Sequence, residues 1–112
     1  YGAEDFETML DQVGSEYLHV HFDAGHLKVT SSSLGLDRRA FIRRLGPKIM
    51  GAHFHENDGI VDAHGAFGPD FWVLDELTHL SQLRYACLET SRQDSVDIEA
   101  MMQMLEKSTT VR

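Results

Sequence analysis

Apolar residues recur along the chain with two different spacings, which separate predicted helices from predicted strands. In four segments they fall every three or four residues, as on one face of a helix: residues 3–13, 36–45, 70–80, and a stretch beginning near Asp94 or Ser95. Three shorter runs carry the apolar and aromatic residues typical of strands: residues 17–22, 49–54 and 83–88. Asp70 is expected to cap the third helix, and residues 31–35 are predicted to form a loop.

The predicted order is helix, strand, helix, strand, helix, strand, helix. Strands that alternate with helices indicate parallel units, so we predict an α/β fold with about three parallel strands and four helices. The length of 112 residues favours a single unit over residues 1–112. Because the first residue is Tyr1 rather than methionine, we also expect the chain to have been cut from a longer one.

Composition limits the partners that this chain is expected to have. Its net charge of −8 at pH 7 argues against strong binding to the phosphates of nucleic acids. No apolar run reaches the roughly 18 residues that a membrane-spanning helix needs, so no membrane contact is expected. The single cysteine, Cys87, cannot form a disulfide within the chain, which fits a location in the reducing cytoplasm.

Side chains suited to bind metal follow each of the three predicted strands. The carboxyl ends of parallel strands meet at one edge of a sheet, where ligands bind. Aspartate, glutamate and histidine together suit several divalent metals, among them Mn²⁺, Zn²⁺ and Co²⁺. Three consecutive strands ending in this way therefore predict a metal site, built from Asp23 and His26 after the first strand, His53, Asp62 and His64 in and after the second, and Glu89 after the third.

These motifs resemble the xylose-isomerase-like superfamily of (β/α)8 TIM barrels, which includes sugar isomerases, epimerases and endonuclease IV. Phe22-Asp-Ala-Gly-His26 is similar to the Asp-x-x-His signature of the sixth barrel strand. Residues 52–68, with His-Phe-His-Glu-Asn-Asp-Gly followed by Asp-Ala-His, are similar to the seventh strand and its loop, and Cys87-Leu-Glu-Thr90 to the eighth strand. The resemblance implies a partial (β/α)8 barrel, the C-terminal half alone.

The resemblance also implies roles for individual residues. Asp23, His53 and Glu89 match the ligands of the central metal, an Mn²⁺, Zn²⁺, Mg²⁺ or Co²⁺ ion. His26, Asp62 and His64 match an additional metal cluster of the endonuclease IV branch. In the epimerase branch Glu89 moves a proton and His26 holds substrate hydroxyls, so these two are the expected catalytic residues.

Three functions remain open from the sequence. The first is a divalent-metal-dependent isomerase or epimerase of sugars or sugar phosphates, working by proton transfer through an enediolate. The second is an endonuclease-IV-like phosphodiesterase acting on abasic DNA, which the net charge and Ala63 oppose, since that branch has arginine there. The third is a non-catalytic half-barrel that associates with itself, because three strands cannot close a barrel and leave open edges. We expect the chain to be inactive alone.

Each candidate residue also has a simpler interpretation. Asp23 could cap a backbone amide, Asp62 and His64 could belong to a solvated loop, and Glu89 could pair with Arg92. The three remaining histidines near these motifs are expected to pack within the barrel or to orient a ligand rather than to bind metal: His19, His21 and His55.

Overall fold

A computed structural model of the protein describes residues 1–91 and 95–110. In chain order the described elements are α1 (Ala3–Val13), β1 (Val20–Asp23), α2 (Ala24–Leu34), α3 (Arg38–Leu45), the 3-10 turn η1 (Gly46–Lys48), β2 (Ile49–Phe54), the 3-10 helix η2 (Trp72–His79), β3 (Tyr85–Leu88) and α4 (Ser95–Thr110). The three strands form one parallel sheet in the order β1-β2-β3. The prediction of an α/β fold with three parallel strands is therefore confirmed.

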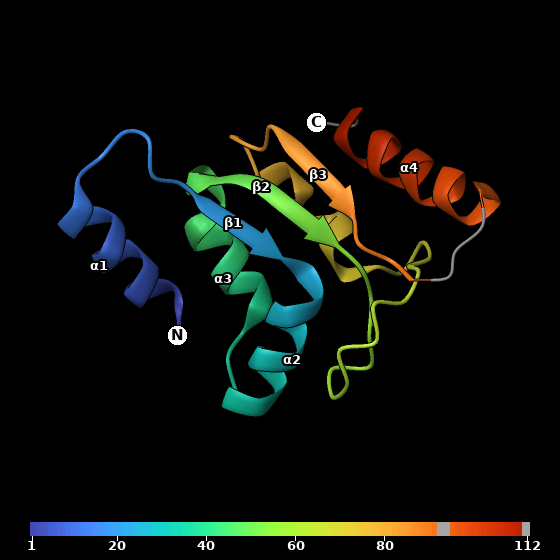
Figure 1. The fold of residues 1–112 in the computed structure, drawn as a ribbon, viewed down its shortest axis with the longest axis horizontal. Helices are drawn as coiled ribbons and strands as arrows, with labels where there is room; N and C mark the ends of the chain where they lie inside the picture. Colours follow the sequence, from blue (N-terminus) through green and yellow to red (C-terminus); the bar gives the residue numbers. More distant parts are fainter. Residues whose placement is uncertain (92–94, 111–112) are drawn as a thin grey trace.

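All three strands run toward the end of the sheet where α2 begins (Figure 1). The pairing aligns Asp23 with His53, and His53 with Cys87. Asp23 is the last residue of β1, while Glu89 directly follows β3 and donates its backbone N–H to the Phe54 carbonyl. The register thus brings the polar ends of all three strands to one rim of the sheet.

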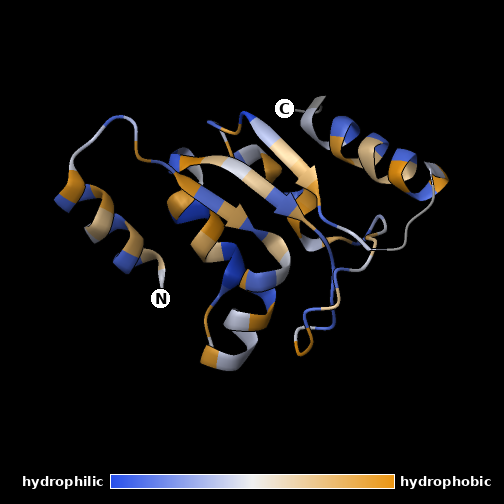
Figure 2. Ribbon diagram, in the orientation of Figure 1, coloured by the Kyte–Doolittle hydropathy of each residue, from blue (hydrophilic) through white to orange (hydrophobic). Residues whose placement is uncertain are grey.

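One face of the sheet is packed. Val20 and Phe22 of β1 and Ala52 and Phe54 of β2 are buried, and they pack in one core with apolar residues of α2, α3 and η2. Burying side chains of this size supplies most of the stabilisation of such a core. The outer helices are less engaged: α1 and α4 carry both hydrophilic and hydrophobic residues (Figure 2), and α1 buries none completely. The core therefore supports the strand ends from one face of the sheet only.

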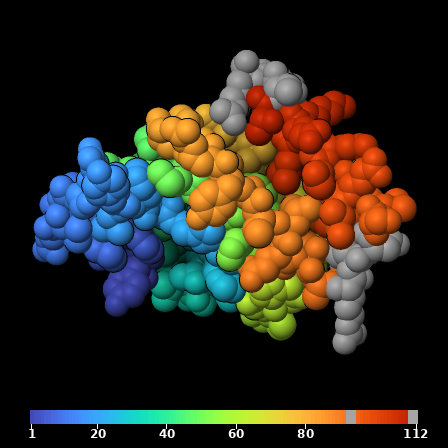
Figure 3. All heavy atoms as spheres, turned by 45° about the horizontal axis from the view of Figure 1, so that its top comes forward, coloured from blue at the N-terminus to red at the C-terminus, as the bar shows by residue number. Residues whose placement is uncertain are grey.

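The other face of the sheet is open. Strand β3 lies at the surface between the two outer helices (Figure 3), and Tyr85 keeps 56% of its surface exposed. The Tyr85 ring lies against Gly51, where a Cβ atom would collide with it, and its hydroxyl is 3.3 Å from His21 Nδ1. Within the described residues, β1 and β3 each pair with β2 alone, so both sheet edges are free.

Two predicted elements were wrong. Helix α2 was not predicted, and residues 31–35 were assigned to a loop although the helix continues to Leu34. Its sequence lacks an apolar stripe, and three serines donate hydrogen bonds back to helix carbonyls, as Ser31 does to Lys28. Within residues 70–80 a 3-10 helix, rather than an α-helix, spans Trp72–His79. Its N-cap is Phe71, in place of the predicted cap Asp70.

Other boundaries differ by a few residues. The first strand begins at Val20 rather than at residue 17, so His19 lies before it. The second predicted helix begins at Arg38, after Asp37 caps it with hydrogen bonds from the backbone N–H groups of Arg39 and Ala40. The last helix is described from Ser95, and the alternative start at Asp94 lies outside the described residues.

A buried carboxylate joins η2 to α3. Glu76 is fully buried, and its oxygens accept hydrogen bonds from Arg39 Nη1 at 3.1 Å and from Arg43 Nε and Nη2 at 3.0 Å. Burial raises the pKa of Glu76, but the hydrogen bonds and charges of the two arginines outweigh it, so the pKa is lowered overall. The ionised Glu76 therefore fixes η2 against α3, beneath the packed face of the sheet.

No helix among the described residues has both the length and the apolar content needed to cross a bilayer.

Candidate metal centre

Four side chains gather where the strands end, and they form the first group. Asp23 Oδ1 lies 2.7 Å from His55 Nε2, and Asp23 Oδ2 lies 3.5 Å from His53 Nδ1. Glu89 Oε2 lies 3.0 Å from His53 Nδ1 and 3.8 Å from His55 Nε2. The structure thus brings together Asp23, His53 and Glu89, the three residues that the sequence assigned to the central metal, and adds His55 to them.

Asp23 has two roles at this rim. Its Oδ1 accepts the backbone N–H of His26 at 2.8 Å, which caps α2, and the same oxygen faces His55. Burial raises the pKa of Asp23, but the His26 N–H and the adjacent His55 outweigh it and lower the pKa overall. The simple capping role foreseen for Asp23 is therefore present, and the carboxylate is kept ionised as a metal ligand must be.

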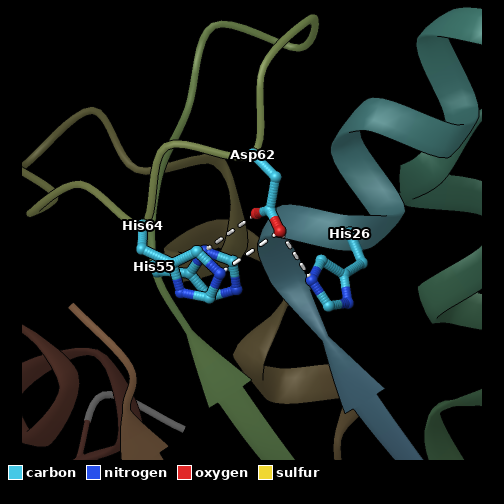
Figure 4. Close-up of side chains that lie close together, drawn as sticks. All are labelled: His26, His55, Asp62 and His64. Atoms are coloured by element: carbon cyan, nitrogen blue, oxygen red, sulfur yellow. Dashed lines mark hydrogen bonds and ion pairs between the residues drawn. The ribbon is translucent and has the colours of Figure 1, made fainter. Parts of the chain in front are cut away.

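A second group lies between α2, which carries His26, and the segment after β2 (Figure 4). Asp62 is at its centre: Oδ2 is 2.9 Å from His26 Nε2 and 3.2 Å from His64 Nε2, and Oδ1 is 3.8 Å from His55 Nδ1. These contacts unite His26, Asp62 and His64, which the sequence assigned to an additional cluster, and again they include His55.

The segment between β2 and η2 holds Asp62 and His64 in place. It is closed at its base by two backbone hydrogen bonds between Glu56 and Gly65, each 2.8 Å long. Asn57 is buried, donates to the Gly25 carbonyl at 3.0 Å and accepts the Gly59 N–H at 2.8 Å. Gly59 has φ of +85°, a conformation that glycine adopts without strain. The Asn-Asp-Gly sequence therefore serves to tie this loop to the start of α2.

Lys28 adds a charged tie between α2 and the same loop. Its Nζ lies 2.8 Å from Glu56 Oε1 and 2.6 Å from the Asn57 carbonyl oxygen. Both charged side chains, Lys28 and Glu56, are shielded from solvent for most of their surface, which reduces the screening of the ion pair. The base of the loop is consequently fixed from both sides, by the backbone pair and by α2.

His64 is held in an unusual backbone conformation. Its φ of +50° is the one positive value among the described residues other than glycine, and such a conformation costs energy in a histidine. The ring stacks on His55 with centroids 4.1 Å apart and planes 2° apart, and Nδ1 donates to the Glu89 carbonyl at 2.9 Å. That hydrogen bond raises the pKa of His64, and the adjacent Asp62 raises it further, while burial offsets part of the rise.

His55 was expected to be structural, packed within the fold or orienting a ligand, and it is fully buried, as that expectation requires. Among the described residues it also belongs to both sets whose donor atoms lie close enough to share a metal ion: His26-His55-Asp62-His64 and, within the first group, Asp23-His55-Glu89 without His53. A Cβ on Gly25 would overlap its ring, so glycine at that position lets the imidazole approach α2. The family resemblance pointed to His53, and the close approach at Gly25 distinguishes His55.

His19 and His21 belong to neither group. His21 packs edge-on against His53, with ring centroids 4.3 Å apart, on the open face of the sheet. His19 is exposed before β1, toward the opposite end of that strand. Arg92, the alternative partner of Glu89, lies outside the described residues.

The donor atoms fit a metal ion. Nitrogen donors of histidine and carboxylate oxygens form the ligand sets of zinc and related divalent ions. The buried His55 Nδ1 has no hydrogen-bond partner, although an unpaired buried polar atom is costly. An ion in the second group would satisfy it.

Comparison with protein-family models finds no match for the chain. Comparisons with curated proteins and with solved structures find no match either.

Proposed function

We propose that this chain forms the metal-binding part of a divalent-metal-dependent isomerase or epimerase of sugars or sugar phosphates. The observation that carries the proposal is the convergence of Asp23, Glu89 and a histidine at the carboxyl ends of three parallel strands. That rim is where ligands bind in parallel α/β folds, and in TIM barrels above all. The motif resemblance supports the same assignment, with the sheet as part of a (β/α)8 barrel.

The residues present divide the expected chemistry between them. A divalent ion held by Asp23, Glu89 and His53 or His55 would polarise the substrate carbonyl and stabilise the negative charge of an enediolate. Glu89 keeps 43% of its side chain exposed, so one oxygen remains accessible to move a proton on the carbon beside that carbonyl. His26, with 58% exposed, faces the same rim and would hold a substrate hydroxyl.

Metal binding to the first group is the test that applies to this chain by itself. Equilibrium dialysis with Mn²⁺ or Co²⁺ should show binding that falls at least tenfold in Asp23→Ala and Glu89→Gln. Asp11→Asn, a change in an exposed carboxylate on α1, is the matched control and should bind as the parent does. Binding that is equal in all four proteins would refute the proposal.

Turnover is expected once further strands complete the barrel. The assay is deuterium exchange from D₂O into a panel of ketoses and ketose phosphates, followed by NMR, because proton abstraction beside the carbonyl precedes isomerisation. Exchange that needs both added Mn²⁺ and Glu89 would support the isomerase proposal. Exchange independent of Glu89 would contradict it.

A phosphodiesterase of the endonuclease IV type is the second candidate. The second group favours it, since His26, Asp62 and His64 are the residues that match the additional cluster of that branch. The charge of −8 opposes it, because DNA phosphates would be repelled. Cleavage of a duplex containing an abasic site in the presence of Zn²⁺, with loss in Asp62→Asn, would favour this candidate over the isomerase.

The free edges of the sheet bear on the third possibility, self-association. An apolar cavity of about 220 Å³ lies beside β1, lined by Phe6 and Phe41 among others, and one of about 440 Å³ lies beside β3, lined by Leu77 and Leu105 among others. We propose that a second copy covers these edges, since exposed edge strands pair readily. Light scattering after size exclusion should show a dimer, and a monomer at every concentration would refute this.

A further inference from the structure

We propose that His55 is the fourth protein ligand of a closed metal site, formed with His26, Asp62 and His64, whose role is to fix the loop of residues 56–65 rather than to perform chemistry. The four side chains come from β2's end, from α2 and from that loop, and each offers one donor atom within 4.8 Å of all the others. The proposal does not require an ion in the first group, so it can be tested and refuted independently of the isomerase proposal.

The spacing of the donors suits four-coordination. With metal–nitrogen bonds of about 2.0–2.1 Å, the corners of a tetrahedral zinc site lie roughly 3.3 Å apart. Asp62 oxygens lie 2.9, 3.2 and 3.8 Å from the facing nitrogens of His26, His64 and His55. The side chains are therefore already near the separations that one small ion would require, and they come from both sides of it (Figure 4).

The two nitrogens of His55 have different environments. Nε2 lies 2.7 Å from the ionised Asp23 and donates its hydrogen there. In the neutral imidazole this leaves Nδ1 as an acceptor, buried and without a hydrogen-bond partner, directed at Asp62. A histidine that binds metal through one nitrogen while it donates the other N–H to a carboxylate is the usual arrangement at metal sites, because the carboxylate fixes the ring and raises its basicity.

The ring of His55 has little freedom to adopt another position. On one side Gly25 allows close approach, and on the other His64 stacks on it with planes 2° apart. The strained backbone of His64, at φ of +50°, is what places this second ring in the stack. Strain of this kind persists where the surroundings enforce it, often at ligand sites.

Four protein ligands imply a structural role. Structural zinc sites are closed by four side chains, whereas catalytic sites keep one position open for water or substrate. An ion here would link β2, α2 and the loop. It would also use His26 as a ligand, so that another residue must hold the substrate hydroxyls. A closed site has no position for a phosphate, which disfavours phosphodiester hydrolysis at this group.

Cobalt spectroscopy tests the coordination directly. Tetrahedral Co²⁺ absorbs visible light far more strongly than five- or six-coordinate Co²⁺, so the first equivalent that enters this site should produce an intense band. We expect His64→Ala, which alters a partly exposed side chain and should fold, to lose the intense band, and His55→Gln to lose it as well. His19→Ala, an exposed histidine outside both groups, and Glu89→Gln, in the first group, should keep it.

Three outcomes would overturn the proposal. One is a weak band characteristic of higher coordination in the parent chain, with Co²⁺ bound. The other is an intense band that persists in a folded His55→Gln protein, which would show that three residues and a solvent molecule suffice. Loss of the band in Glu89→Gln but not in His64→Ala would equally overturn it, because the tetrahedral ion would then belong to the first group.

Discussion

Substitution of Gly25 by alanine tests how far the second group depends on one close approach. A Cβ at this position would overlap the His55 ring, and even Nε2 would lie 2.8 Å from it, where ordinary contact begins at 3.4 Å. The ring must therefore retreat by more than about half an ångström, which weakens the 2.7 Å contact with Asp23. Gly25 is in the first turn of α2, with a backbone conformation open to alanine, so the effect comes from the side chain alone.

Two effects of this substitution have predictable sizes. Overpacking a buried position costs about 1–3 kcal/mol of the free energy of unfolding. Displacing a ligand or its hydrogen-bonded support lowers metal affinity about 10–100-fold. We expect Gly25→Ala to remain folded, with a lower midpoint in urea, and to bind Zn²⁺ at least tenfold more weakly in a competition titration with a chromophoric chelator.

Gly68→Ala provides the control for this experiment. A Cβ there would meet only the flexible carboxylate of Asp70, at 3.4 Å, and neither metal-binding group includes it. Its stability and Zn²⁺ affinity should match those of the parent. If Gly25→Ala bound Zn²⁺ as tightly as Gly68→Ala does, His55 would not be a ligand held in place by this contact, and the assignment of the fourth ligand would be wrong.

Three further results are expected. Glu76→Ala should lower the free energy of unfolding by about 2 kcal/mol, as urea denaturation would show. This is less than the roughly 3–5 kcal/mol of a broken fully buried ion pair, because Arg39 and Arg43 regain solvent. The pKa of Glu76 is lowered in the folded state, so the ionised carboxylate contributes its full stabilisation to folding above its ordinary pKa of 4.5. This stabilisation is lost as the pH falls through the lower pKa of the folded state. The difference in unfolding free energy between the parent and Glu76→Gln should therefore shrink over that acid range and stay constant near neutrality. Zn²⁺ should protect the loop of residues 56–65 from proteolysis in the parent and not in Asp62→Asn, and equal cleavage with and without Zn²⁺ would contradict the structural role.

The three strands were predictable because their signal is local. Each is a short apolar run, and the alternation with helices fixes their parallel arrangement. Helix α2 was not predictable in this way, since all its buried residues except Leu27 are small, and the hydroxyls of its serines donate to the helix backbone. What defines α2 is a cap at each end: the Asp23 side chain before it and Gly35 in the left-handed conformation after it.

The candidate site was likewise predictable only in part. Asp23 is the last residue of β1 and Glu89 directly follows β3, so their position at one rim follows from the topology. The choice between His53 and His55 depends on tertiary contacts: the period of two places His53 on the open face and His55 beyond the strand's last residue, where periodicity no longer applies. The position of the His55 ring depends on the Asn57 hydrogen bonds and on the space that Gly25 leaves for it. Neither can be inferred from the spacing of residues in the sequence.

The two groups differ in how firmly the chain holds them, and this difference suggests separate roles. In the first, Glu89 is held through its backbone N–H and carbonyl, while its side chain is close to half exposed, with the open face of the sheet beside it. In the second, the loop that carries Asp62 and His64 is fixed by the Glu56–Gly65 pair and by Asn57. A substrate needs an accessible ligand sphere, whereas a structural ion needs a rigid one. Because His55 donates to Asp23, an ion in the rigid group would orient a ligand of the accessible one, so removing it should weaken metal binding at both.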